Sequence, residues 1–124
     1  MGVATAAVKI TIASSTTVSS LADLAGGVLV GFVCKAAWTA AGVTFQVSAD
    51  GTTFYDLYKS AGAAAAPTIV QIGAAGAPTI PADKYISLID ADTGQTWNHG
   101  YRFIKVVSTV AQVADRDIQL YIRF

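Results

Sequence analysis

The chain has 124 residues, a length typical of one domain with its own hydrophobic core. Its formal net charge is +0, so it carries neither the basic field that holds nucleic acid nor an acidic tail. Only 13% of the residues are charged and 53% are hydrophobic, so we expect part of the surface to be buried against other chains.

Residue usage favours β structure. Every acidic residue is Asp, a poorer helix former than Glu, and Thr, Val and Ile are frequent. The single cysteine, Cys34, excludes an internal disulfide. The first residues lack the pattern of a signal peptide, and no apolar run is long enough to span a membrane. We therefore expect a protein made in the cytoplasm, with no membrane partner.

The N-terminal part contains one clear strand pattern. Apolar and polar residues alternate from Val8 to Ile12, which predicts a strand with one solvent-exposed face. Residues 14–20 are polar and fit a loop or a weak edge strand. Residues 21–27 predict one helical turn ended by glycine. We expect a single domain over residues 1–124, with residues 1–27 as a less compact N-terminal segment.

The middle of the chain predicts a central strand and a hairpin. Residues 28–37 are apolar on both faces, as in a strand covered on both sides, and Cys34 is expected to be a core residue rather than a reactive thiol. Alternation from Val43 to Ser48, followed by Asp50-Gly51, predicts a hairpin whose second strand covers residues 54–58. Phe54 and Leu57 are three apart, so a strand that buries both carries a bulge or a twist.

Residues 59–81 are rich in Ala and Gly and are interrupted by Pro67 and Pro78. We expect two small-residue loops around a short strand, Thr68–Ile72. These loops either pack closely against a neighbouring subunit or form an exposed surface loop, and the sequence leaves both readings open.

The last third predicts two long strands. A short strand, Lys84–Ile89, and a polar loop, Asp90–Gly100, precede a strand at Tyr101–Val110. The chain then closes with a strand whose alternation places Ile118, Leu120, Ile122 and Phe124 inward. Many short strands without a long amphipathic helix predict an all-β fold, an antiparallel β-sandwich of the jelly-roll type.

The sequence provides little for catalysis. His99 is the only histidine, and no second His or Cys lies near it, which argues against a zinc site. No Gly-x-Ser-x-Gly motif suggests a hydrolase. Residues 90–94 resemble the start of a calcium loop but lack its later ligands, so a turn capped by Asp side chains is favoured over a calcium site. We expect no enzyme activity and no cofactor or metal.

The aromatic residues are the remaining candidates for binding. Exposed aromatic rings stack on sugars in sugar-binding β domains and anchor protein interfaces elsewhere. Trp97 lies in a polar loop and is expected at the surface. The candidate ligand or partner contacts are Trp97, His99, Tyr101, Trp38 and Tyr58.

Three segments carry a family resemblance. VTFQVSADGTTFYDLY resembles the hairpin of discoidin-like and carbohydrate-binding jelly rolls, and YRFIKVVST with IQLYIRF resembles their late strand pair. Together with TIPADKYISL, and from Val28 onward, the chain looks like small structural proteins of tailed bacteriophages. It differs from discoidin domains in its length and in lacking their paired cysteines.

This resemblance implies a non-enzymatic virion protein that decorates or cements the capsid. Its partners would be the major capsid protein or other virion proteins, and not nucleic acid. A homo-oligomer is expected, a trimer if the protein caps threefold positions, and the protein would be found in the virion. The alternative is a carbohydrate-binding or host-attachment module in a head fibre or tail accessory, with a glycan as ligand.

Overall fold

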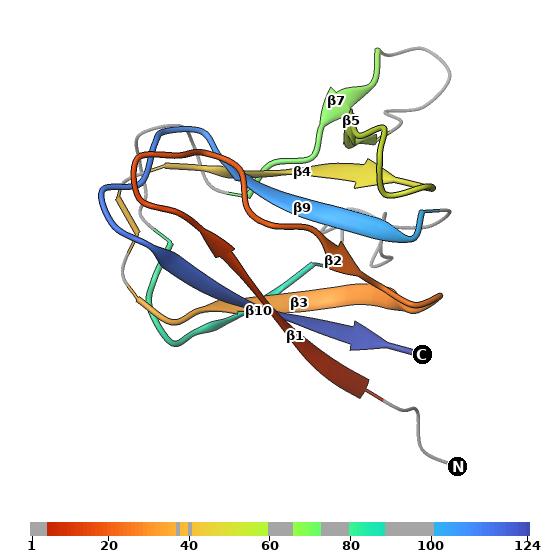
Figure 1. Cartoon of the computed structure of the whole chain (residues 1–124), viewed down its shortest axis with the longest axis horizontal. Helices are drawn as coiled ribbons and strands as arrows, with labels where there is room; N and C mark the ends of the chain where they lie inside the picture. The colour runs from red at the N-terminus through yellow and green to blue at the C-terminus, as the bar shows by residue number, and fades with distance from the viewer. Residues whose placement is uncertain (1–4, 37, 40, 60–65, 73–79, 89–100) are drawn as a thin grey trace.

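The computed structural model in Figure 1 describes residues 5–36, 38–39, 41–59, 66–72, 80–88 and 101–124. Within these residues the regular secondary structure is entirely β. The strands are β1 Thr5–Ile12, β2 Ala22–Asp23, β3 Val28–Cys34, β4 Val43–Ser48, β5 Tyr55–Asp56, β6 Tyr58–Lys59, β7 Thr68–Ile69, β8 Tyr85–Ser87, β9 Phe103–Ser108 and β10 Arg116–Arg123.

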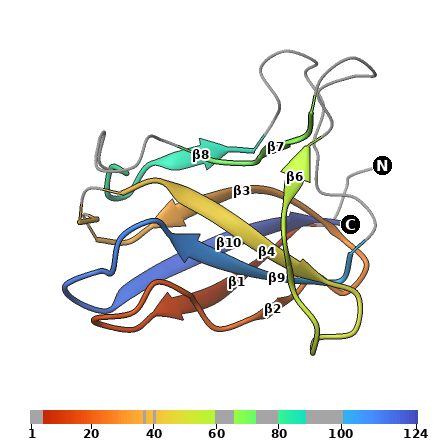
Figure 2. The same cartoon turned by 90° about the horizontal axis from the view of Figure 1, so that it is seen from above.

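Two four-stranded antiparallel sheets pack face to face. The first has the order β1-β10-β3-β8 and the second β2-β9-β4-β5, while β6 and β7 form a separate two-stranded sheet. Figure 1 shows the two layers from the side, with β7 projecting above β4, and Figure 2 shows β6 crossing over β4. This confirms the predicted antiparallel β-sandwich.

The pairing follows the jelly-roll pattern. Without β6 and β7, the remaining strands pair from the outside inward: β1 with β10, β2 with β9, β3 with β8 and β4 with β5. That is the pairing of one long hairpin ribbon. Rolling the ribbon adds the contacts of β10 with β3 and of β4 with β9, which produces two Greek-key sheets.

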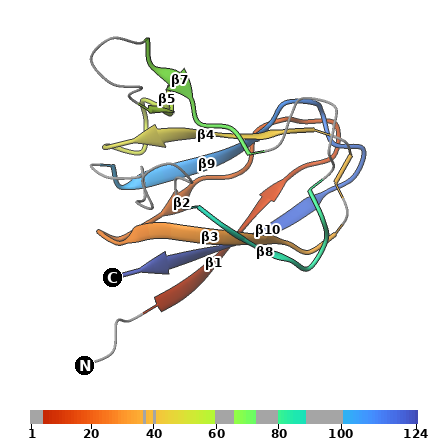
Figure 3. The ribbon, with the colours of Figure 1, turned by 180° about the vertical axis from the view of Figure 1, so that it is seen from behind.

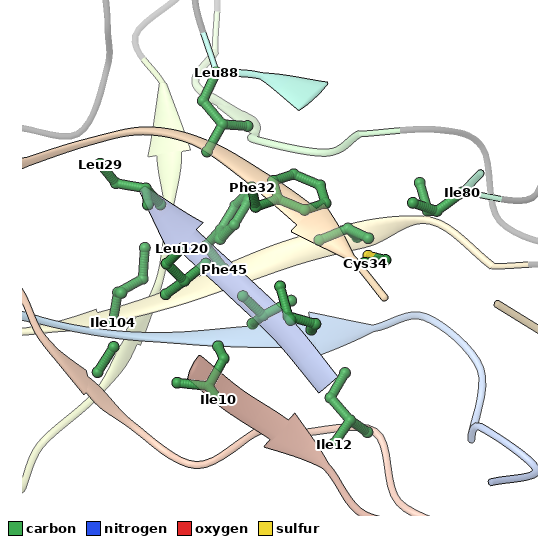
Figure 4. Packing of buried hydrophobic residues seen from close by; sticks show 14 of the residues in the cluster. Ile10, Ile12, Leu29, Phe32, Cys34, Phe45, Ile80, Leu88, Ile104 and Leu120 are labelled. Carbon is green, nitrogen blue, oxygen red and sulfur yellow. The ribbon is translucent and has the colours of Figure 1, made fainter. Parts of the chain in front are cut away.

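The core lies between the sheets. Phe32 from the first sheet and Phe45 from the second meet edge to face, with ring centroids 6.5 Å apart and planes at 72°. Figure 4 shows the residues around them. The buried hydrophobic cluster is Ile10, Ile12, Ala22, Leu24, Leu29, Phe32, Cys34, Trp38, Ala41, Val43, Phe45, Leu57, Val70, Ile80, Leu88, Ile104, Val106, Ile118, Leu120 and Ile122.

The N-terminal segment contributes to both sheets. The strand predicted at residues 8–12 is confirmed as part of β1, and its residues Ile10 and Ile12 are buried. The helical turn predicted at residues 21–27 is wrong. Ala22 and Leu24 both point into the core, which is the period of a strand, and a turn with positive φ at Ala25 and Gly26 follows.

Strand β3 confirms the predicted central strand but has a more complex pattern of burial. Its register against β10 shifts so that Tyr121 pairs with Gly31 and Ile122 with Leu29. The extra residue, Val30, is a β-bulge, so Leu29 and Phe32 are both buried although three positions separate them. The other face of β3 is partly exposed rather than fully covered.

The predicted hairpin is confirmed, since Val47 of β4 pairs with Tyr55 of β5. The returning strand is interrupted at Leu57. There the backbone N–H still donates to Phe45 O of β4, while the Leu57 carbonyl accepts from Val70 N beyond β7. This change of partner buries Leu57 and starts the β6–β7 extension.

The turn of this hairpin is held by Ser48 and Asp50. Ser48 Oγ accepts from Gly51 N at 2.9 Å, and Asp50 Oδ1 accepts from Thr52 N and Thr53 N at 2.9 and 3.0 Å. Gly51 has a φ of 80°, which glycine adopts without strain. The hydrogen bonds from Thr53, Thr52 and Ser48 lower the pKa of Asp50 from its ordinary value of 3.8.

We expect Asp50→Ala to lower Tm at pH 7 because two turn N–H groups lose their acceptor. The lowered pKa means that the stabilisation by the Asp50 carboxylate is present above pH 3.8 and is lost as the pH falls through the folded-state pKa. The difference in Tm from the wild type should therefore shrink below about pH 4. Thermal unfolding across pH checks this. Asp50→Asn keeps an acceptor, so its Tm should lie closer to the wild type at pH 7; an equal loss would contradict the hydrogen-bond explanation.

The late strands agree with prediction except at the C-terminus. β9 and β10 lie within or near the predicted segments, and Ile118, Leu120 and Ile122 are buried. The inward prediction for Phe124 is wrong: it follows the end of β10, is 52% exposed and lies near Gly27. The polar loop predicted at residues 90–100 lies outside the described residues.

Candidate functional site

A shallow hollow lies at one end of the sandwich, where β2 turns into β3 and the chain enters β9. Its volume is about 390 Å³, and its described lining is Ala25, Gly26, Tyr101 and Arg102. The β2–β3 turn forms one wall of the hollow. Within this turn, Asp23 Oδ1 accepts a hydrogen bond from Ala25 N at 2.8 Å. Leu24 N donates to Arg102 O at 2.7 Å and fixes this turn against the entry to β9.

An ion pair stands beside the hollow. Arg102 donates from Nε to Asp23 Oδ1 and from Nη2 to Asp23 Oδ2, both at 2.9 Å, which is the bidentate geometry of a guanidinium on a carboxylate. The Arg102 hydrogen bond lowers the pKa of Asp23, and Asp23 raises the pKa of Arg102. Both side chains are exposed, so the pair presents polar groups to solvent rather than stabilising the fold strongly.

Tyr101 is the predicted contact residue that this hollow contains. Its hydroxyl is buried and has no hydrogen-bond partner among the described residues. Burial raises the pKa of the phenol above its ordinary value of 10.0. The exposed Arg102 guanidinium and the Asp23 carboxylate that it binds offer donors and an acceptor suited to a hydroxyl-rich or polar ligand, whereas the buried Tyr101 hydroxyl is closed to such a ligand.

The other predicted contacts do not join Tyr101. Tyr58 is 54% exposed on β6, on the extension that β6 and β7 make above the second sheet. Trp38 is only 4% exposed and lies in the core at the opposite end of the sandwich, so a contact through its ring would require the core to open. Trp97 and His99 lie outside the described residues.

Sequence reasoning missed Asp23 and Arg102. They are 79 positions apart, and only the pairing of β2 with β9 brings them together. The nearest feature in the sequence is the segment of residues 21–27, LADLAGG, whose pattern predicts a helical turn and not a binding site.

The end of the sandwich near Trp38 is held by a buried glutamine, Gln112. Its Oε1 accepts from Thr39 N at 2.9 Å and from Arg116 Nε at 3.1 Å, while its Nε2 donates to Ser108 Oγ at 2.9 Å. Its backbone carbonyl accepts from Ser15 N at 2.7 Å. One side chain therefore joins the β3–β4 connection to the β9–β10 connection.

Cys34 is fully buried in the same region, as predicted for a core residue. Burial raises the pKa of its thiol to about 12, and the neighbouring Trp38 opposes this rise by a smaller amount. A protonated, inaccessible thiol is a poor nucleophile.

We therefore expect Cys34 in the folded protein to resist a thiol reagent such as DTNB at pH 8. The same reagent should label it fully once denaturant unfolds the chain, which serves as the control. Rapid stoichiometric labelling without denaturant would contradict the burial of this side chain.

An aromatic pair, one ring exposed and one half-buried, lies on the outer face of the first sheet. Tyr85 of β8 and Tyr121 of β10 have ring centroids 5.3 Å apart. Tyr85 reaches across β3 at Gly31, where a Cβ would lie only 2.3 Å from the ring, so any other residue would displace it. Figure 3 shows β8 beside β3 on this side of the molecule.

No group of three or more potential metal-binding His, Cys, Asp or Glu side chains occurs among the described residues. The same part of the chain has no helix long and apolar enough to cross a membrane. Comparison of the sequence with protein-family models, and of the chain with curated proteins and solved structures, finds no match.

Proposed function

We propose that this chain is a non-enzymatic structural protein of a tailed-bacteriophage virion, which decorates or cements the capsid. It works by burying apolar β surface against other subunits, with the major capsid protein or another virion protein as partner. The sequence resemblance supplies the virion assignment, and jelly rolls are a common architecture of viral capsid domains.

The observation that carries this proposal is the apolar surface of the sandwich. Charged residues make up only 13% of the chain, and several large hydrophobic side chains remain exposed after the core is complete. Scattered single residues of this kind are ordinary, but together with so little charge they favour burial by partners. They are Val18, Leu21, Tyr55, Tyr58, Tyr85, Val110, Val113 and Phe124.

The direct test uses particles of the phage that encodes the chain. We expect peptide mass spectrometry of purified virions to find the chain at many copies per particle. Purified protein should also co-sediment with capsids that lack it, and bind them more tightly than free capsid subunits because an assembled lattice presents several contacts at once. Its absence from intact virions would overturn the proposal.

A glycan-binding role is the second candidate, and the hollow beside Tyr101 favours it. Arg102 lines the hollow, and its guanidinium is held by the Asp23 carboxylate. A glycan array with the wild type and with Arg102→Ala tests this role: binding that the variant loses would support an attachment module. Binding that persists in the variant would place the sugar elsewhere, and no binding would remove this candidate.

A further inference from the structure

Strand β1 has one side with free hydrogen-bonding groups among the described residues. It lies at the edge of the first sheet and pairs with β10 from Thr5↔Arg123 to Ile12↔Arg116. On its other side, Ser20 N donates to Thr11 O at 3.1 Å and Thr11 N donates to Ser20 Oγ at 3.3 Å. Figures 1 and 3 show the Thr5 end of β1 running outward from the body of the sandwich.

These two hydrogen bonds reveal which backbone groups face the open edge. The N–H and C=O of Thr11 point away from β10, and the direction repeats every second residue in an antiparallel ladder. The N–H and C=O groups of Lys9, Ala7 and Thr5 therefore also point away from β10. The Ala7 and Lys9 side chains are exposed, which agrees with an edge that described residues leave uncovered.

The edge has few of the features that keep edge strands from pairing. Its pairing with β10 is continuous over eight residues without a bulge, it contains no proline, and its only charge is Lys9. Natural proteins usually protect such an edge with prolines, bulges, several charges or a covering segment.

We propose that two copies of the chain pair through β1, antiparallel, across a two-fold axis at Ala7. Ala7 then faces Ala7 of the second copy, and Lys9 faces Thr5 of the second copy. Each of these pairs exchanges both backbone hydrogen bonds, because the groups that point outward are those of residues 5, 7 and 9. The first sheets of the two copies become one continuous sheet.

Charge favours this register over one centred on Lys9. A two-fold axis at Lys9 would place the two ammonium groups directly opposite each other, which is unfavourable in a cross-strand pair. With the axis at Ala7 they lie four positions apart along the strands, about 14 Å, where solvent and salt screen their repulsion. The same register sets Val8 against Ala6 of the second copy on the inner face, where Val8 packs at the margin of the core.

This contact predicts a closed dimer and not the trimer expected for a threefold cap. A two-fold pairing of identical edges uses up the edge of both copies, so it cannot add a third. The inference does not depend on a virion role, and its test uses the purified chain alone. Failure of the dimer and failure of capsid binding are therefore separate results.

The first test is the mass of the purified protein, measured by light scattering over a concentration series. We expect twice the 12.8 kDa chain mass, with Ala7→Pro reduced to the monomer. The Ala7 N–H faces away from β10, so proline removes no hydrogen bond inside the chain and is acceptable on an edge strand. Circular dichroism and Tm close to the wild type confirm that this variant folds.

Charge substitution at Ala7 tests the axis itself. Ala7→Lys and Ala7→Glu each place like charges opposite each other at the proposed axis, so each variant alone should be monomeric. Mixed in equal amounts they should form a heterodimer, detectable by native mass spectrometry, which weakens as salt is added. Val113→Lys and Val113→Glu change an exposed residue in the β9–β10 connection and should both leave the dimer intact.

A wild-type protein that is monomeric or trimeric at all concentrations would overturn the proposal. A dimer that survives Ala7→Pro and both Ala7 charge variants would also overturn it, because the contact would then lie elsewhere. If Ala7→Pro fails to fold, the behaviour of the mixed charge variants decides the question.

Discussion

Phe45→Ala is expected to lower the free energy of unfolding by about 4 kcal/mol. Phe45 is fully buried on β4, and its ring meets Phe32 of the opposite sheet at a centroid distance of 6.5 Å. Removing the ring loses its burial, its contact with Phe32 and the packing of the residues around it. Since domains of this size are stable by roughly 5–15 kcal/mol, the variant should lose a large part of its stability.

Denaturant unfolding measures this change, and Phe54→Ala is the matched control. Phe54 is only half-buried on the outer face, where the Lys105 ammonium lies 4.3 Å from the ring centroid. Its removal should cost about 1 kcal/mol, the combined size of partial burial and an exposed cation–π contact. Similar losses for the two variants would show that Phe45 does not hold the sheets together as described.

Gln112→Leu is expected to lower the free energy of unfolding by about 3 kcal/mol, although leucine is nonpolar and similar in size. The change leaves the partly buried Thr39 N without its Oε1 acceptor, and it removes the Nε2 donor of the buried Ser108 Oγ, which keeps only its hydrogen bonding with Val110. It also removes the acceptor of Arg116 Nε. Buried polar groups that lose their partners pay the full cost of leaving water.

Gln119→Leu is the control for this second prediction. Gln119 lies half-buried on β10, and its side-chain oxygen accepts a hydrogen bond from Tyr121 Oη at 3.2 Å. Its loss should cost less than about 1 kcal/mol. Amide hydrogen exchange adds a local readout, because the Thr39 N–H should lose protection in Gln112→Leu. A neutral effect of Gln112→Leu would mean that water or another side chain replaces the glutamine.

The candidate site could be predicted only in part. Tyr101 is one of the five predicted contact residues, and it lines the hollow. The solvent exposure of the predicted aromatic contacts could not be read from the sequence. Tyr58 is open to solvent and Trp38 is buried, although both are aromatic residues in or beside the predicted hairpin. Asp23 and Arg102 gave no local signal, since an ion pair across two strands depends on which strands become neighbours.

The sequence by itself determined the strands with a clear period of two. Residues 8–12 and 43–48, with the end of β10, alternate in the way that one buried face requires, and the structure places them in strands. Asp50-Gly51 likewise specified its turn. These features are local, because the direction of successive side chains follows from the extended backbone and glycine adopts positive φ on its own.

The tertiary structure alone decided what depends on distant partners. β10 lies between β1 and β3, so Gly31 and Leu29 straddle a bulge that neither segment's sequence predicts. Residues 22–24 form a strand and turn rather than a helix because β9 supplies the hydrogen bonds that this short segment lacks by itself. Gln112 is buried because two connections close over it. In each case the energy comes from contacts between residues far apart in the chain, which a local pattern cannot encode.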